Sequence, residues 1–445
     1  MDAYADHLAK VNEVHDVIAT DDICNAQGQI LVKKGSSIDA TTAARIARFK
    51  LQKPLEHSVV IENELNEDML VQCFDVFLNS DQCTEYLYQK FNQPDLLRNY
   101  CKLFTSYPLL RQKVTVLSLI MPAIFEQAMF CAWFGVTLSQ ALGERMGSPE
   151  NIFIAAMCHD VGMVHINTEL LNKQGALTLE EWRQIQAHPV IGYNIVKDTK
   201  GIGASVARAV LEHHENLDGT GYPRGSIGSK LGHEGQLLNL LDSMNAIYNK
   251  NFKPFKRSLG GLIPVIQMNQ QSRFGVAAKQ LILLLRELPE QSTHGIPPEL
   301  AGDVIAAVKA RNAYIIRGIE ICGDIANEVG FRHDDPKLAS IQNAIIHITI
   351  SIAQSGIVND AYMRWLDQVV SEKLDHALAE VEEAYLMMQE IIYHIDRLKR
   401  QIQLYLEKQS ASAIAKCLAV SVEQLEQEKV PEISSHLSKV WLFKR

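Results

Sequence analysis

The chain has 445 residues, of which 47% are hydrophobic and 21% are charged, values typical of a globular protein with roughly two to four domains. Its 43 Lys and Arg residues against 52 Asp and Glu residues give a net charge of −9, so no overall positive field attracts nucleic acid or anionic lipid. This composition excludes a disordered chain, a collagen and a basic DNA-coating protein. It leaves 15 histidines unexplained, because several of them cluster between residues 159 and 233.

The first 64 residues predict a small module that contains β-strands, because short β-branched runs alternate with turn signals at 25–28 and 33–37. The N-terminus is acidic and lacks the apolar run of a signal peptide. The eight cysteines lie far apart with no CxxC pair. We therefore expect a cytoplasmic protein with reduced thiols.

From residue 65 the periodicity becomes helical and remains so to the C-terminus, apart from a glycine-rich passage at 215–235. Between Val114 and Gly143 only Glu126 is charged, which is long enough to suggest a membrane span. Polar residues interrupt this stretch, so we predict two buried core helices and no membrane span. The fold class is therefore mostly α, in four parts: a β-containing module over 1–64, a helical linker region over 65–118, a central domain over 119–288 and a helical C-terminal region over 289–445.

A capping box predicts where one helix of the central domain begins. Thr178 is expected at the N-cap, with Glu181 three residues later. This helix is predicted to carry Trp182 and to hold His188 about two turns from its start.

The C-terminal region has a heptad-like apolar pattern over 374–402, in which Lys399 is the one break. Two interpretations are open: a coiled coil that forms a hairpin or a homodimer seam, and a long amphipathic helix packed on its own domain. Residues 413–427 have the apolar spacing of a helix-turn-helix. The second of those helices would be acidic, however, which argues against a nucleic acid polymer as partner. The apolar positions of the heptad-like pattern are Leu378, Val381, Tyr385, Met388, Ile392, Ile395 and Ile402.

Between residues 159 and 242 the chain offers imidazole and carboxylate groups, the donors that iron, manganese and zinc accept. An adjacent His and Asp mean little alone, whereas His213–His214 before a glycine-rich turn is a rarer pattern. Asp242 lies in an apolar run, where an unpaired buried carboxylate is costly, so it needs a cation. A carboxylate of this set can bridge two metal ions, and water between them would be acidified to a hydroxide nucleophile. The candidate metal ligands are His159, Asp160, His188, His213, His214 and Asp242.

Four strings around these residues closely resemble the HD-GYP domain, a branch of the HD metal-dependent phosphohydrolases. The resemblance runs from near residue 120 to near residue 275. It implies an all-helical domain that hydrolyses cyclic di-GMP in bacterial second-messenger signalling, through a hydroxide bridged between two divalent transition metal ions. Iron or manganese is expected first, with zinc or nickel as alternatives. The strings are CHDVG (158–162), LLNKQGALTLEEWRQIQAHPVIGYNIV (170–196), LEHHENLDGTGYPRG (211–225) and LLDSMNAIY (240–248).

Carried over position by position, the resemblance implies a role for each matched residue. His159 and Asp160 are the implied catalytic pair, with Asp160 as the metal bridge. One metal is implied on His188, His213, His214 and Asp160, and another on His159, Asp160 and Asp242. Tyr222 is expected near the substrate, in a loop shaped by Asp218, Gly219, Gly221 and Pro223. The implied substrate-binding residues are Asp218, Gly221, Tyr222, Pro223, Arg224, Lys253 and Lys256.

Four positions depart from the family pattern. Gln127 stands where the family has a histidine, and Ala123 where it has a glutamate for a third metal, so a trinuclear site is not expected. Met163 replaces a lysine that contacts the scissile phosphate, and Asn245 replaces a second aspartate. A second interpretation therefore stays open: a catalytically degenerate HD-GYP domain that acts as a metal- or cyclic-di-GMP-binding receptor or as a protein-interaction module.

Overall fold

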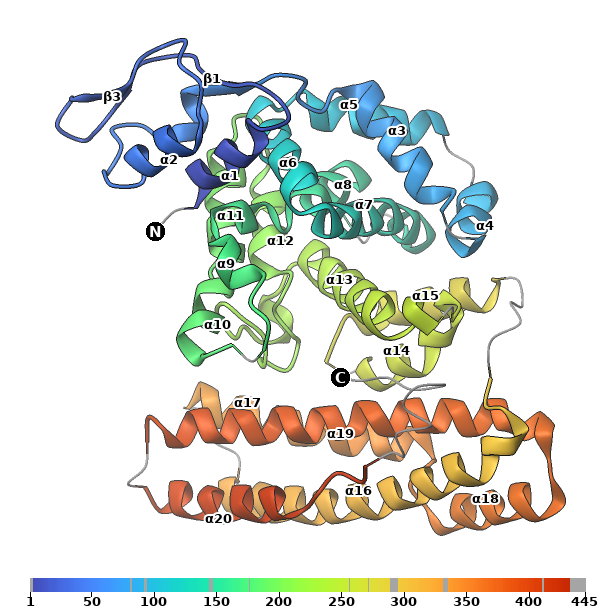
Figure 1. The fold of residues 1–445 in the computed structure, drawn as a ribbon. Coiled ribbons are helices and arrows are strands. Elements are labelled where there is room, and N and C mark those ends of the chain that lie inside the picture. The colour runs from blue at the N-terminus through green and yellow to red at the C-terminus, as the bar shows by residue number, and fades with distance from the viewer. Residues whose placement is uncertain are drawn as a thin grey trace. The chain divides into compact units, whose positions relative to one another are not determined.

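The computed structural model describes residues 3–80, 82–91, 94–143, 147–175, 177–255, 257–270, 272–288, 295–330, 335–409 and 412–432. These residues are mostly helical, with short strands only near the N-terminus (Figure 1). The predicted fold class, mostly α with a small N-terminal strand-containing module, is confirmed.

The chain divides into two compact units. The first comprises residues 1–215, 222–224 and 231–245, and the second comprises residues 216–221, 225–230 and 246–445. The boundary lies inside helix α13 (His233–Asn251). The first unit thus joins the N-terminal module to most of the central domain, and the division at 64, 118 and 288 stays a prediction.

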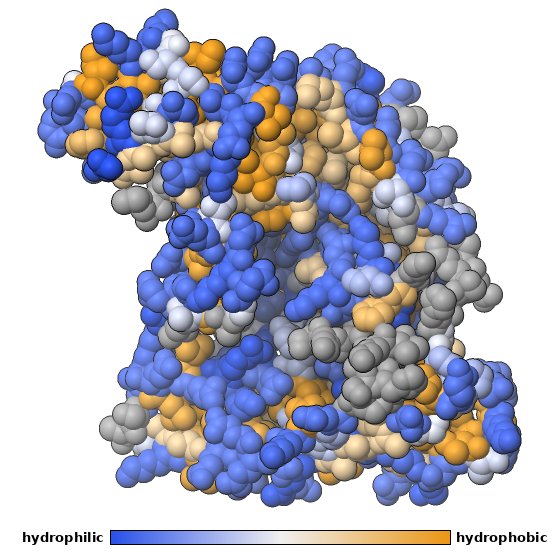
Figure 2. Space-filling view, in the orientation of Figure 1, coloured by the Kyte–Doolittle hydropathy of each residue, from blue (hydrophilic) through white to orange (hydrophobic). Residues whose placement is uncertain are grey.

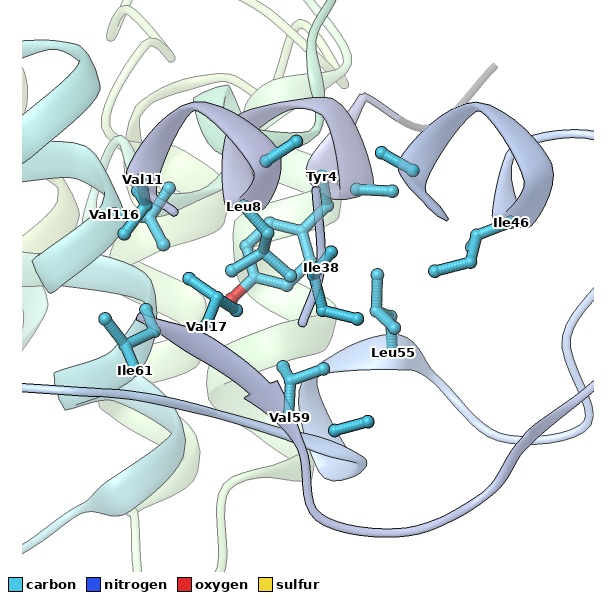
Figure 3. Close-up of a cluster of buried hydrophobic side chains, with 14 of the residues drawn as sticks. Tyr4, Leu8, Val11, Val17, Ile38, Ile46, Leu55, Val59, Ile61 and Val116 are labelled. Carbon is cyan, nitrogen blue, oxygen red and sulfur yellow. The ribbon is translucent and has the colours of Figure 1, made fainter. Parts of the chain in front are cut away.

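The N-terminal module is a pair of two-stranded antiparallel sheets with two helices. Strand β1 pairs with β4 in the register Val17↔Ile61, and β2 pairs with β3. Figure 3 shows residues of its hydrophobic cluster, which includes Tyr4, Leu8 and Ile38 and also Val116 of helix α6 (Pro108–Ile120). The module therefore shares one core with the helices that follow it. Its elements are α1 (Tyr4–Val11), β1 (Val17–Ala19), β2 (Ile23–Cys24), β3 (Ile30–Val32), α2 (Ala40–Ile46), η1 (Leu55–His57) and β4 (Val59–Ile61).

Helix α7 packs against α3, α6 and α8 and is buried along most of its length. Proline at the start of α6, α7 and α8 suits the first turn, where a backbone N–H has no partner to lose. The apolar stretch 114–143 forms the end of α6 and all of α7, as the sequence predicts. The elements are α3 (Glu67–Leu78), α4 (Gln82–Phe91), α5 (Pro94–Thr105), α6 (Pro108–Ile120), α7 (Pro122–Leu142), α8 (Pro149–Cys158), η3 (Val161–His165), α9 (Thr168–Leu171), α10 (Leu179–Ile185), α11 (His188–Asp198), α12 (Ala204–Glu212) and α13.

The capping box is confirmed at the start of α10. The Thr178 hydroxyl accepts from the Glu181 N–H at 3.3 Å, and the Glu181 carboxylate accepts from the Thr178 N–H at 2.7 Å. The predicted position of His188 on this helix is wrong, because α10 ends at Ile185 and His188 begins α11. Pro189 explains the break: it lacks an N–H, and its ring would clash with the carbonyl of Ile185 in a continuous helix.

The second unit is built around the long helix α19, which packs against α14, α16, α17 and α20. Residues 413–427 form the single helix α20, so the helix-turn-helix interpretation is wrong. No proline or glycine interrupts that segment, and Ser412 caps its first turn. The remaining elements are η4 (Gly228–Lys230), η5 (Lys253–Phe255), η6 (Leu259–Leu262), α14 (Ile263–Asn269), α15 (Gly275–Arg286), η7 (Pro298–Leu300), α16 (Ala301–Val329), α17 (Pro336–Ser355), α18 (Asp360–Glu372), η8 (Asp375–Ala377), α19 (Leu378–Leu406) and α20 (Ala413–Gln427).

The heptad-like pattern lies on α19, and all seven of its apolar residues are buried within this chain. This burial favours the amphipathic helix over the coiled coil, and it leaves the predicted homodimer seam without support. Lys399, the break in the pattern, lines a cavity of about 580 Å³ together with Lys250 and Arg400. A charged residue is tolerated there because it faces this cavity and not the apolar core.

Among the described residues, no single helix is both long and apolar enough to cross a membrane. Within the part of the chain that the structure describes, the bent pair Pro336–Ser355 and Asp360–Ser371 reaches the required length and composition together. On the face shown in Figure 2, hydrophilic side chains predominate and hydrophobic residues lie in small groups.

Candidate metal centre

Three histidines of the first unit are held in the same way. His159 follows α8, His188 follows α10 and His213 follows α12. Each Nδ1 lies next to the carbonyl oxygen three residues earlier, at 2.7 Å from Ala156, 2.7 Å from Ile185 and 2.6 Å from Val210. Carbonyls in the last turn of a helix have no partner within it, so the rings fill an otherwise unsatisfied position. Because a carbonyl oxygen only accepts, Nδ1 carries the hydrogen and Nε2 of a neutral ring keeps its lone pair.

The three free ring nitrogens converge on the Asp160 carboxylate. Its oxygens lie 3.0 Å from His188 Nε2, 3.7 Å from His213 Nε2 and 3.4 Å from His159 Nε2. The His188 and His213 Nε2 atoms are themselves 3.2 Å apart. In each ring, Nδ1–H is thus donated to a backbone carbonyl, and Nε2 points toward the Asp160 carboxylate. Donation of the second ring N–H to a carbonyl is what orients histidine ligands at metal sites.

Asp242, on α13, is a second buried carboxylate near these histidines. Its carboxylate lies 3.6 Å from His159 Nε2 and 3.6 Å from Nδ1 of His214. The Asn239 amide, one turn earlier, donates to the His213 carbonyl at 3.0 Å and ties α13 to the end of α12. The structure therefore brings all six predicted ligands together.

The buried carboxylates are kept ionised by the histidines around them. Burial raises the pKa of Asp160, but His159, His188 and His213 outweigh it and hold that pKa well below its usual range. Burial likewise raises the pKa of Asp242, and the neighbouring His159 and His214 lower it to about 2. Two anionic carboxylates inside the protein favour a bound cation.

The pKa values of His159, His213 and His214 are shifted in different directions. Burial lowers the pKa of His159, yet Asp160 and Asp242 raise it well above its ordinary value. For His213 burial is the main cause of a lowered pKa, and for His214 burial and the adjacent His213 lower the pKa further. His213 and His214 are therefore neutral near pH 7, as metal ligands must be.

The candidate ligand atoms fall into two groups. Among the described residues, two groups have their ligand atoms within 4.8 Å of one another: Asp160 with His188, His213 and His214, and Cys131 with His159 and Asp242. The His159 Nε2 and the Asp160 Oδ1 are buried and have no hydrogen-bond partner of suitable geometry. Buried polar atoms without partners are costly unless something else satisfies them, and a cation would do so here.

Gly162 lets the segment after the His-Asp pair approach α11. A Cβ at this position would lie 2.1 Å from the His188 carbonyl oxygen and 2.9 Å from the Gly192 nitrogen. Only glycine leaves room for this contact between two backbones. Gly162 therefore sets the distance between Asp160 and His188.

Of the implied substrate-binding residues, Tyr222, Pro223 and Arg224 lie in the same unit as the metal ligands. The Tyr222 ring is 4.6 Å from that of His214 and 6.3 Å from that of Trp182, measured between centroids. The Tyr222 N–H donates to the His214 carbonyl, and the Arg224 N–H donates to the Glu215 carboxylate at 2.7 Å. Tyr222 thus borders the metal ligands, with its ring half-buried.

The other implied substrate-binding residues belong to the second unit or are not described. The Asp218 carboxylate accepts from Arg397 at 2.8 Å and from the Thr220 N–H at 2.9 Å, and Gly221 lies in the same loop. This pairing supports loop shaping by Asp218. Lys253 is exposed in η5, and Lys256 lies outside the described residues.

Two of the residues that depart from the family pattern, Gln127 and Met163, contact other parts of this unit. The Gln127 amide donates to Asp242, so it contacts a metal ligand without offering an imidazole. Met163 is partly buried against the hydrophobic cluster of the N-terminal module. In this chain, position 163 therefore contributes to the packing of that module.

Sequence reasoning missed two residues of the site. Cys131 lies one helical turn after Gln127, and that spacing could have suggested that both face the same group. Burial, with Asp242 and Asp160 nearby, raises the pKa of the Cys131 thiol. Trp182 is the other residue, and its contact with Tyr222 joins two segments far apart in the chain, which no local sequence signal indicates.

Residues 117–277 match the HD domain family. The chain is 31% identical over 135 residues to the cyclic di-GMP phosphodiesterase PdeB of Borreliella burgdorferi, covering 29% of this chain and 35% of that protein. It is 36% identical over 93 residues to the 3'3'-cGAMP-specific phosphodiesterase 3 of Vibrio cholerae, covering 21% of this chain and 20% of that protein. A solved HDG"Y"P protein from Bdellovibrio bacteriovorus aligns with 61% of this chain and 94% of its own at 16% identity, with a TM-score of 0.31, too low to support an argument.

Residues 117–277 are therefore similar to HD domains. The matched segment spans about a third or less of the length of these curated relatives. What those proteins hydrolyse is thus a guide to this chain's function and not a finding about it.

Proposed function

We propose that this protein is a metal-dependent phosphodiesterase that hydrolyses a cyclic dinucleotide, cyclic di-GMP first among them, at a binuclear centre. One observation carries the proposal: the Nε2 atoms of His159, His188 and His213 converge on the Asp160 carboxylate, and two of the buried atoms there lack hydrogen-bond partners. The names of the relatives support a cyclic dinucleotide as substrate.

The proposed ligand sets follow the two groups of donor atoms. Asp160, His188, His213 and His214 would hold one ion, and His159 and Asp242 would hold the other with Asp160 between them. Bound divalent ions supply Lewis acidity, which acidifies water and offsets charge on the phosphate. The protein's own part is to hold three rings by their Nδ1–H groups, so that the ligand geometry exists before a metal binds.

The aromatic pair beside the ligands suggests how the substrate is oriented. Tyr222 lies against His214, and Trp182 is 41% exposed beside it. Guanine and adenine both stack on aromatic rings, typically with about 1–3 kcal/mol per base. We propose that Tyr222 and Trp182 contact a base, while Arg224, exposed in the same loop, meets a phosphate.

The test combines metal analysis with nucleotide analysis. Protein purified without oxygen should contain a stoichiometric transition metal and convert cyclic di-GMP to pGpG or GMP, and Asp160→Ala should abolish both. Parallel incubation with 3'3'-cGAMP decides which cyclic dinucleotide is preferred. Absence of metal from the wild-type protein would contradict the proposal.

A receptor is the second candidate, because Gln127 contacts Asp242 where the family has a histidine, and Met163 packs against the N-terminal module. A catalytically degenerate domain would bind metal or cyclic di-GMP and act through protein interactions. Binding of cyclic di-GMP without any turnover, in protein that contains metal, would favour this function over the enzyme.

A further inference from the structure

We propose that Cys131 is a thiolate ligand of the metal ion held by His159 and Asp242, and that this ion is therefore zinc or iron(II) in preference to manganese. The inference rests on the metal centre of the proposed function and adds a ligand that the histidine and carboxylate pattern does not contain.

Helix α7 faces this metal group at two successive turns. Gln127 donates its amide to Asp242, and Cys131 follows it by four residues, which places both side chains on the same side of the helix. The first of these positions offers an amide where an imidazole is expected from the family pattern. The second offers a sulfur atom, so α7 can still provide a strong metal donor.

The distances suit coordination by Cys131. Its Sγ, a ring nitrogen of His159 and a carboxylate oxygen of Asp242 lie within 4.8 Å of one another, and all three residues are buried. Bonds of about 2.0–2.3 Å to zinc place neighbouring ligand atoms roughly 3–4 Å apart. Small side-chain adjustments therefore bring the three donors to one ion.

A second observation points to the same place. The Nε2 of His159 is fully buried without a hydrogen-bond partner, while its Nδ1 is held by the Ala156 carbonyl. The ring is thus fixed with its free nitrogen directed toward the group that contains Cys131 and Asp242.

The competing explanation is that Cys131 is simply a small buried side chain, since free cysteines are often fully buried. Cys158 provides the matched control. It is equally buried, on the neighbouring helix α8 and directly before His159, yet it is not part of either group of donor atoms.

The added sulfur would make the two metal positions unlike. Asp160, His188, His213 and His214 offer only nitrogen and oxygen, which also suit manganese. A thiolate is a soft ligand and selects zinc or iron over manganese. We therefore expect manganese to fill one position more readily than the other.

X-ray absorption at the zinc edge tests the proposal on the full-length wild-type protein, stripped of metal and reloaded with two equivalents of zinc without oxygen. We expect a sulfur neighbour at about 2.3 Å, averaging about half a sulfur per zinc. A spectrum with nitrogen and oxygen neighbours alone, in protein that binds zinc, overturns the proposal whether or not any variant folds.

Substitutions then show which cysteine supplies the sulfur neighbour. Cys131→Ser should lose the sulfur neighbour and bind about one equivalent of zinc, whereas Cys158→Ser should keep both. In the Cys131→Ser background, Gln127→His should restore the second equivalent, because it returns an imidazole to α7. An unchanged sulfur signal in Cys131→Ser would overturn the assignment.

These outcomes separate the inference from the proposed function. If the wild-type protein shows the sulfur neighbour but hydrolyses no cyclic dinucleotide, Cys131 is a ligand and the enzymatic function fails. If it hydrolyses the dinucleotide with no sulfur neighbour, the inference fails alone. If it binds no zinc, iron or manganese, both fail.

Discussion

Two pairs of buried histidines, one in each unit, have the same contact and opposite surroundings. His188 and His213 lie 3.2 Å apart between their Nε2 atoms, and so do His347 and His394. The first pair faces the Asp160 carboxylate. Beside the second pair, the Ser351 hydroxyl lies 3.4 Å from His347 Nδ1.

The charges around the second pair differ from those around the first. Burial lowers the pKa of His347 to about 4, with Asp218 opposing and Arg397 and Arg273 adding to the shift. The Asp218 carboxylate is itself paired with Arg397. Among the described residues, the pair His188 and His213 belongs to a group of candidate metal ligands because the Asp160 carboxylate joins it.

The largest expected effect is on metal affinity, when one histidine of the first pair is replaced and the matching histidine of the second pair serves as the control. His188→Gln should lower metal affinity by more than about a hundredfold, because loss of a direct ligand exceeds the 10–100-fold cost of losing an outer partner. His347→Gln should leave metal content unchanged. Titration of both variants with zinc, followed by metal analysis, checks this difference, and equal losses would remove the distinction between the two pairs.

The tight approach at Gly162 gives the next prediction. Gly162→Ala should cost about 3 kcal/mol of unfolding free energy and weaken metal binding, because its Cβ would meet the His188 carbonyl. Gly318→Ala on α16 is the matched control in the second unit. Its Cβ would meet only the tip of the Ile395 side chain, at 2.8 Å, which can move. Thermal denaturation and zinc titration of both variants measure the contrast, and similar destabilisation would show that Gly162 has no special role.

The pH dependence of stability separates the pairs further. The pKa of His347 is lowered on folding, so below about pH 6.5 the unfolded chain binds a proton that the folded chain does not, and stability falls toward pH 4. Between pH 7 and pH 5 this loss amounts to about 2 kcal/mol. His347→Gln should remove this contribution and so reduce the slope, while His376→Gln, at an exposed position, should not. Urea unfolding of the metal-free proteins at both pH values is the measurement, and an unchanged slope in His347→Gln would contradict it.

The smallest expected effect is on the phosphodiesterase rate, when a positive charge is introduced at position 163. Met163→Lys should raise the phosphodiesterase rate, up to about tenfold, by placing a cation near the phosphate. It should also lower stability by about 1–2 kcal/mol, because Met163 packs against the N-terminal module. Met163→Leu keeps the packing and should change neither. Initial rates with cyclic di-GMP and thermal denaturation test this, and a rate at or below that of the wild-type protein would show that position 163 does not reach the substrate.

Most of the fold and the ligand set could be predicted because they depend on local signals. Helical periodicity, the Thr178 capping box and the apolar stretch 114–143 all led to elements that the structure contains. The six candidate ligands lie in strings whose resemblance to a known domain is specific. The placement of His188 failed because the strong helix signal after Thr178 hid the effect of Pro189.

By itself, the sequence determined the class of the fold and predicted the donor types and the candidate ligands, since these follow from periodicity, from side-chain chemistry and from the family resemblance. Only the tertiary structure decided which residues that are distant in the sequence lie next to one another. Cys131 joins His159 and Asp242, Met163 packs against the N-terminal module, and the heptad-like face of α19 is filled by its own unit. The physical reason is that such contacts join residues far apart in the chain, so they depend on how the helices pack and leave no local pattern in the sequence.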